Sequence, residues 1–205
     1  PAGGGKPCLQ QSLECVVECM KDRILAKERD FVGVLLFGTE QCKVPNDHQG
    51  FPHISLLQDL EEPSATSMRK ISLVVSQLAA QAQAQGNPGA SNATEFGSIA
   101  TSPAFDLANV LWVASMLFGG ANVKNTRRRL YLLTNDDNPC SANPATRPRA
   151  LTRSRDLQDA NVWVEPFFFA PAPPKGFDLS PTSFWRELVG EVRQNYTPAR
   201  KTPGG

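Results

Sequence analysis

Apolar residues fall along the chain in short blocks, and the spacing within each block predicts a strand or a helix. Residues 31–37, 129–134 and 162–169 are strand-length apolar runs, and residues 53–57 form a shorter one, expected at a sheet edge. Leu130 to Leu133 form a near-continuous run, typical of a strand buried on both faces of a parallel sheet. We expect the strand at 31–37 to lie parallel to it, and Pro166 indicates a bulge or an edge position in the third strand.

Between these runs, the apolar residues recur at helical spacing. We expect helices over residues 9–26, 68–82, 104–118 and 149–160, and a last helix after Ser180 and Pro181. Ser102 and Pro103 are residue types preferred at a helix start, and residues 86–102 have the composition of a flexible surface loop. Strands that alternate with helices predict an α/β fold, in which a mostly parallel sheet is flanked by helices in a three-layer sandwich.

Polar residues gather where two of the predicted strands end. Thr39 follows the strand at 31–37, and Asn135, Asp136, Asp137 and Asn138 follow the strand at 129–134. Because function in open α/β sheets concentrates at the carboxyl ends of the strands, we expect these residues to share one rim. We interpret the rim as a structural turn or a protein-contact patch.

Composition and charge narrow the class of protein. With 205 residues, 40% hydrophobic and 20% charged, the chain suits one soluble domain, and it has no run of membrane-spanning length. The net charge is +1, but residues 121–155 carry 8 Lys/Arg against 2 Asp/Glu, a local charge of +6. This block either contacts an acidic partner such as DNA phosphates or forms a solvated face, partly neutralised by Asp156 and Asp159. Its basic residues are Lys124, Arg127, Arg128, Arg129, Arg147, Arg149, Arg153 and Arg155. In the helix at 149–160, Arg153 can pair with Asp156 and Arg155 with Asp159.

The sequence offers little catalytic or metal chemistry. Five cysteines without a CxxC pair favour reduced thiols in a cytosolic or nuclear protein, and Cys8, Cys15 and Cys19 suit the edge of a buried helix face better than half a metal site. No Walker motif, dinucleotide fingerprint or GxSxG elbow occurs, and both histidines fall in one predicted loop. We therefore expect no catalytic residues, metal or cofactor in this domain.

Several motifs together resemble the amino-terminal von Willebrand A-type domain of the Ku proteins, in particular that of the smaller Ku subunit. They are FGTE at 37–40, LANVLWV at 107–113, LTNDDNP at 133–139, RDLQD at 155–159 and GFD at 176–178. The resemblance implies an A-like domain over residues 1–193 and a linker over 194–205 toward a β-barrel domain. It also implies that the family's central first strand and its acidic loop would precede Leu9 and lie outside this chain.

The resemblance implies a subunit that pairs with a larger Ku subunit and binds DNA double-strand-break ends in the nucleus, mainly through the β-barrel. The implied roles are recruitment of end-joining factors in non-homologous end joining, and telomere maintenance. This domain would make protein contacts and flank the DNA, and the resemblance implies no membrane partner.

Two alternatives belong to other classes. A metal-dependent adhesion or transport A-type module would need an Asp-x-Ser-x-Ser loop upstream, and only Asp136 or Asp137 is a candidate ligand here. An enzyme is the second alternative, because Ku proteins are credited with ATP-dependent helicase activity and with a lysine-based lyase.

Overall fold

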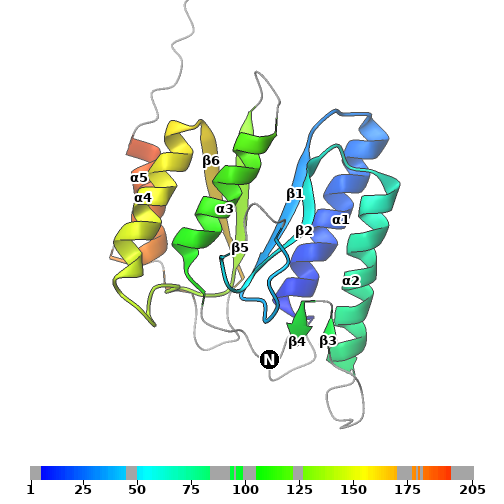
Figure 1. Cartoon of the computed structure of the whole chain (residues 1–205), viewed down its shortest axis with the longest axis horizontal. Helices are drawn as coiled ribbons and strands as arrows, with labels where there is room; N and C mark the ends of the chain where they lie inside the picture. Colours follow the sequence, from blue (N-terminus) through cyan, green and yellow to red (C-terminus); the bar gives the residue numbers. More distant parts are fainter. Residues whose placement is uncertain are drawn as a thin grey trace, which may run out of the picture.

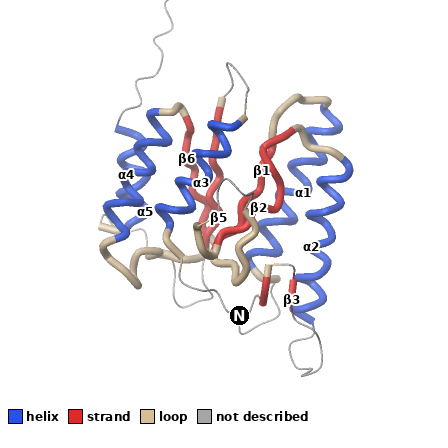
Figure 2. The backbone as a smooth tube through the Cα atoms, viewed as in Figure 1, coloured by secondary structure: helices blue, strands red, loops and turns tan. Residues whose placement is uncertain are grey.

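The computed structural model describes residues 6–44, 50–83, 93–94, 96–98, 105–121, 127–169, 177–178, 180 and 182–194. Its elements confirm an α/β fold, with strands lying between helices (Figures 1 and 2). In chain order they are α1 Cys8–Ala26, β1 Val32–Phe37, β2 Ile54–Glu61, α2 Ala65–Gln83, β3 Ala93–Thr94, β4 Gly97–Ser98, α3 Leu107–Gly120, β5 Arg128–Thr134, α4 Thr146–Asp159, β6 Val162–Phe168 and α5 Phe184–Gln194.

The strand pair β1–β2 is antiparallel. Leu35 lies opposite Leu56 and Phe37 opposite Ile54, while the register shifts on both sides of Val34. Close to this irregularity, a Cβ atom on Gly33 would lie 3.3 Å from the backbone of Leu60, so the two backbones can approach because Gly33 has no side chain.

The strand pair β5–β6 is parallel, as the sequence predicts for its central strand. Its register is unbroken from Arg128 opposite Val162 to Thr134 opposite Phe168. Pro166 lies opposite Leu132 without a register shift, and β6 pairs with β5 alone among the described strands. The edge position expected from Pro166 is therefore confirmed.

Two hydrophobic cores divide the molecule. One joins α1 and α2 to one face of β1–β2, through residues such as Met20, Leu36 and Ile71. The other is built mainly by α3, α4 and α5 against β5–β6, and it reaches the opposite face of the first pair at Ile54. Helix α3 is central to this second core, because Leu111 and Val113 are fully buried.

Strands β1 and β5 run in the same direction, each descending toward the lower edge in Figure 1. This agrees with the predicted parallel orientation. In the part of the chain that the structure describes, however, no hydrogen-bonded ladder joins them: β1 pairs with β2, and β5 pairs with β6. Each of the two strands therefore presents an edge that no described strand covers.

Three local predictions were wrong. Strand β5 is buried on one face only, as the 48% exposure of Tyr131 shows. The helices α3, α4 and α5 all pack on the other face. Helix α3 begins at Leu107, not near Ala104, because the Asp106 carboxylate accepts the Ala108 amide at 2.9 Å and caps it there. Residues 93–98 contain a small antiparallel pair, where we expected only a loop.

The last helix begins at Phe184, three residues beyond the expected cap at Ser180 and Pro181. Phe184, Trp185 and Leu188 are buried, as their spacing predicts. Ser102, Pro103 and Pro181 lie outside the described residues.

Candidate functional site

The polar loop after β5 is held by a chain of short hydrogen bonds. The Thr134 hydroxyl accepts the Asp136 amide at 3.1 Å, and the Asp136 carboxylate accepts the Asn138 amide at 2.9 Å. The Asn138 carbonyl in turn accepts the Ser141 amide at 2.9 Å. The side chain of Asp136 is thus used inside its own turn, as expected of an aspartate that follows a strand.

Helix α5 fixes the same loop from the core. The indole nitrogen of Trp185 donates to the backbone carbonyl of Asp136 at 2.8 Å, although 49 residues separate them. Trp185 is 1% exposed and packs against Phe184 and Phe168 at ring distances of 5.0 and 5.7 Å. A buried donor thereby binds a partly buried carbonyl of the loop.

Cys140 closes the loop on its buried side. Its side chain is 4% exposed, and burial raises the pKa of its thiol, while a hydrogen bond with Thr146 acts in the opposite direction. A thiol with a raised pKa stays protonated and unreactive at neutral pH.

Thr39 follows β1, and its polar groups are used within its own turn. Its hydroxyl donates to the Gln41 carbonyl at 2.7 Å and lies 3.2 Å from the Ser55 hydroxyl, and its carbonyl lies 2.9 Å from His53 Nδ1. Among the hydrogen bonds of the described residues, none connects Thr39 with residues 135–138. Thr39 instead organises the turn between β1 and β2, where Gly38 has a φ of +69°.

Arg147 connects the starts of α4 and α5. Its guanidinium donates to the Glu187 carboxylate, at 2.9 Å from Nε, and to the Thr182 carbonyl at 3.2 Å. The same group lies 5.8 Å from the centre of the Phe184 ring. The charge of Arg147 is therefore used within the fold.

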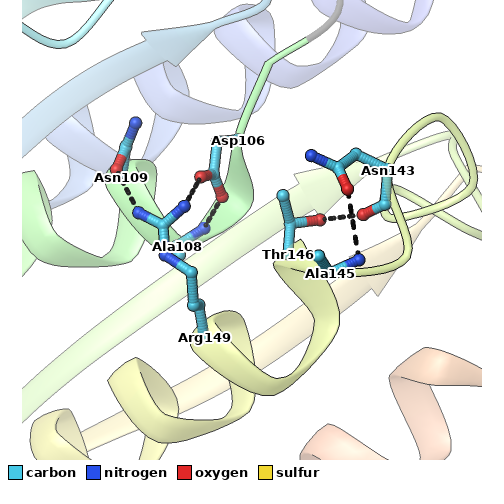
Figure 3. A network of polar contacts seen from close by, with 7 residues as sticks. All are labelled: Asp106, Ala108, Asn109, Asn143, Ala145, Thr146 and Arg149. Atoms are coloured by element: carbon cyan, nitrogen blue, oxygen red, sulfur yellow. Dashed lines mark hydrogen bonds and ion pairs between the residues drawn. The ribbon is translucent and has the colours of Figure 1, made fainter.

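Arg149 joins α4 to the start of α3 (Figure 3). Its guanidinium donates to Asp106 at 2.8 Å, while the other carboxylate oxygen of Asp106 caps α3. Figure 3 also shows Asn143, which binds Ala145 and Thr146 at the start of α4. Asp106 therefore serves two helices at once.

Two further arginines pair with carboxylates, one within α4 and one across the β5–β6 pair. Arg153 binds Asp156 at 3.0 Å, as the sequence predicts, and its guanidinium stacks 4.0 Å from the centre of the Trp112 ring. Arg129 lies 3.7 Å from Glu165 across the β5–β6 pair. Its hydrogen bond to Tyr131, and then the Glu165 charge, raise the pKa of Arg129.

The expected basic block is thus divided among separate positions. Arg127 and Arg128 lie at the start of β5 and have no carboxylate partner among the described residues. Arg147 and Arg149 lie at the opposite end of the molecule, near the start of α4. Arg155 lies on α4, and Lys124 lies outside the described residues.

Sequence reasoning missed the acidic partners, Asp106 and Glu187. Asp106 had a usable signal, since an aspartate directly before an apolar helical run is a preferred cap. Glu187 had none, because it lies 40 residues from Arg147.

No group of three His, Cys, Asp or Glu side chains in the described part of the chain is arranged to hold a metal ion. Among the described helices, none combines the length and apolar character needed to cross a membrane.

The chain is similar to a protein family and to several curated proteins. The model of the Ku70/Ku80 N-terminal alpha/beta domain matches residues 2–201. X-ray repair cross-complementing protein 6 of Mus musculus is 28% identical over 178 residues, which are 87% of this chain and 26% of that protein. ATP-dependent DNA helicase II subunit 1 of Phaeosphaeria nodorum is 32% identical over 180 residues, 87% of this chain and 25% of that protein. ATP-dependent DNA helicase ku70 of Dictyostelium discoideum is 28% identical over 195 residues, 90% of this chain and 20% of that protein. The chain thus spans about a quarter of the length of the curated relatives it matches.

Proposed function

Because this chain belongs to the Ku70/Ku80 N-terminal alpha/beta domain family, we propose that it is part of a subunit of a DNA double-strand-break end-binding heterodimer. The proposal includes non-homologous end joining, telomere maintenance and a nuclear location. The observation that carries it is the family match over residues 2–201, on an α/β fold with a parallel strand pair. The relatives named subunit 1 or ku70 favour the smaller of the two Ku subunits.

Within this proposal, residues 1–193 form the A-like domain and residues 194–205 form a linker toward a β-barrel domain that binds the DNA end. The domain itself makes protein contacts, at the rim of Thr39 and residues 135–138, and flanks the DNA. The larger Ku subunit and end-joining factors are the proposed partners.

Direct DNA contact by this domain is proposed for Arg127 and Arg128 above all. The guanidinium groups of Arg129, Arg147, Arg149 and Arg153 already bind carboxylates within the fold. Phosphate contacts by Arg127 and Arg128 would be weak and independent of sequence, as suits a domain beside the DNA rather than around it. Lys124 and Arg155 are proposed as secondary contacts.

No enzymatic step is assigned to this domain. Helicase activity is stated in the names of relatives about four times as long, and the present sequence has no Walker motif. The metal-dependent adhesion module gains no support from Asp136, because in the described part of the chain it belongs to no group of three side chains that could hold a metal ion.

Two binding experiments test the proposal. A full-length form, co-expressed with the larger Ku subunit, should bind linear duplex DNA much more tightly than a covalently closed circle. Equal affinity for the two DNA forms would refute end binding.

At the level of this domain, the combined change Arg127→Glu and Arg128→Glu should weaken duplex binding equally for all sequences. It should also flatten the dependence of log Kd on log salt, by about 0.9 for each phosphate that the protein no longer neutralises. Lys21→Glu on α1, paired with Glu18, is the matched control and should change neither. If the control and the arginine variants behave alike, the domain does not contact DNA through the start of β5.

A further inference from the structure

One face of the β5–β6 pair is aromatic, and none of the described helices covers it. Tyr131, Trp163 and Phe167 are 48%, 46% and 49% exposed. They alternate along the strands with Leu132 and Val164, which are buried in the core beneath the helices. The rings of Tyr131 and Phe167 pack edge to face at 5.5 Å, and Trp163 lies on the same face, opposite Arg129.

This exposure is unusual for the type of strand pair. Parallel strands are normally covered by helices on both faces, and β5–β6 has helices on one. Contiguous aromatic groups left at the surface mark interaction sites, and tyrosine and tryptophan contribute most to the binding energy of interfaces.

The dimensions of the face suit one α-helix. Strand pairing places Arg129 opposite Trp163, Tyr131 opposite Glu165 and Leu133 opposite Phe167, which gives three rows of outward side chains. Three rows extend about 13 Å along the strands, and two strands are about 10 Å wide with their side chains. An α-helix of about nine residues has the same length and diameter.

The charges around the face define the polar part of such a helix. Arg129 and Glu165 are paired with each other inside the face. Just before β5, Arg127 alternates with Arg129 onto this face and adds a positive charge that no carboxylate of the described residues balances. An acidic turn on the incoming helix would complement Arg127.

We propose that the outer face of β5–β6 docks an amphipathic α-helix from a partner protein. The apolar stripe of the helix covers Tyr131, Trp163 and Phe167, and its acidic turn meets Arg127. The docking site does not depend on DNA binding or on the strand-end rim, because it is built from the aromatic surface and the charge beside it.

The probe is a fluorescein-labelled helical peptide of about 16 residues, with leucines spaced i, i+3, i+4 and i+7 and glutamates in one terminal turn. It is made in two forms, with the acidic turn at either end, and two control peptides replace the glutamates by lysines or the leucines by serines. Fluorescence anisotropy measures the affinity of each for the 205-residue chain. We expect the acidic leucine peptide to bind in one of its two forms, and both controls to bind at least tenfold more weakly.

Variants of the chain then locate the site. Trp163→Ser and Phe167→Ser should each weaken peptide binding at least tenfold. Leu73→Ser on α2, where the side chain is 60% exposed, is the matched control and should leave it unchanged. Circular dichroism and thermal melting establish that each variant is folded. Because these changes add no charge, duplex DNA binding should stay the same, which separates the aromatic part of the docking site from the proposed DNA contact at Arg127.

Several results would overturn the proposal. One is that neither acidic peptide binds at about 100 µM. Another is that the Phe167→Ser and Leu73→Ser variants bind the peptide equally well. A dimer of the chain that Phe167→Ser dissociates in sedimentation experiments would assign the face to a second copy. Binding by the 205-residue chain but not by a longer form would assign it to a segment of the same polypeptide.

Discussion

The bond between Trp185 and the loop after β5 allows a quantitative prediction. Trp185→Phe removes the only hydrogen-bond donor of the indole, so the Asp136 carbonyl loses a partner 2.8 Å away. A buried carbonyl left unsatisfied costs about 1–3 kcal/mol. Phenylalanine is also smaller than tryptophan, and its weaker packing against Phe184 and Phe168 adds about 1 kcal/mol.

The free energy of unfolding should therefore fall by about 2–4 kcal/mol, which is a large part of the 5–15 kcal/mol that stabilises a typical domain. For a domain of this size, that loss lowers the melting temperature by about 4–16 °C. Urea unfolding followed by circular dichroism measures the free energy, and calorimetry measures the melting temperature.

The chain contains a matched control for the same substitution. Trp163→Phe changes a side chain that is 46% exposed, so the unfolding free energy should change by no more than about 0.5 kcal/mol. Replacing Trp185 with benzothienylalanine, which keeps the shape of the side chain but lacks the N–H, separates the hydrogen bond from the packing. If Trp185→Phe costs no more than Trp163→Phe, then α5 does not hold the loop in the way described.

Four further outcomes are expected. Asp106→Ala should lower the unfolding free energy by about 1–2 kcal/mol, because it removes a helix cap. Arg149→Ala should lower it by less than about 1 kcal/mol, because it removes only an exposed ion pair. Equal losses in chemical unfolding would contradict this. Since folding raises the Cys140 pKa, its contribution to stability is complete below the ordinary value of 9.0 and is lost as the pH rises above it, so wild type and Cys140→Ala should converge in stability at high pH. Magnesium or manganese should leave the melting temperature unchanged, and a rise that depends on concentration would support a metal site. A form extended upstream by roughly thirty to forty residues should have a higher melting temperature and aggregate less than the 205-residue chain, because β1 and β5 each have an edge that no described strand pairs with. Equal behaviour of the two forms in melting and size exclusion would argue against a strand between β1 and β5.

The sequence predicted those elements whose signal is local. The apolar stripes of α1 and α2 repeat at helical spacing, and the parallel partner of β5 follows from a strand, a helix and another strand in succession. Arg153 and Asp156 are three residues apart on one helix, so their pairing was also visible. The pair expected between Arg155 and Asp159 stays a prediction.

Features that depend on distant segments were not predictable in the same way. The apolar composition of β5 indicates a strand but not whether helices cover one face or two, and Tyr131 lies on the uncovered one. The charges of residues 121–155 suggested one basic surface. Partners from other segments, Glu187 for Arg147 and Asp106 for Arg149, neutralise much of it.

The division of the strands into two pairs has a consequence for how the molecule opens. In the described chain, no backbone hydrogen bonds join β1 to β5. The β1–β2 pair and the β5–β6 pair therefore contact each other through side chains, in the core that contains Ile54, Leu132 and residues of α3. Side-chain contacts alone couple segments less cooperatively than a continuous ladder, and such segments can unfold as separate units. Amide hydrogen exchange should then distinguish a unit of α1, β1, β2 and α2 from a unit of β5, α4, β6 and α5, each with its own free energy of opening. Truncation of Leu111 should lower the free energy of opening of the second unit more than that of the first, because the buried side chains of α3 belong to the core of the second.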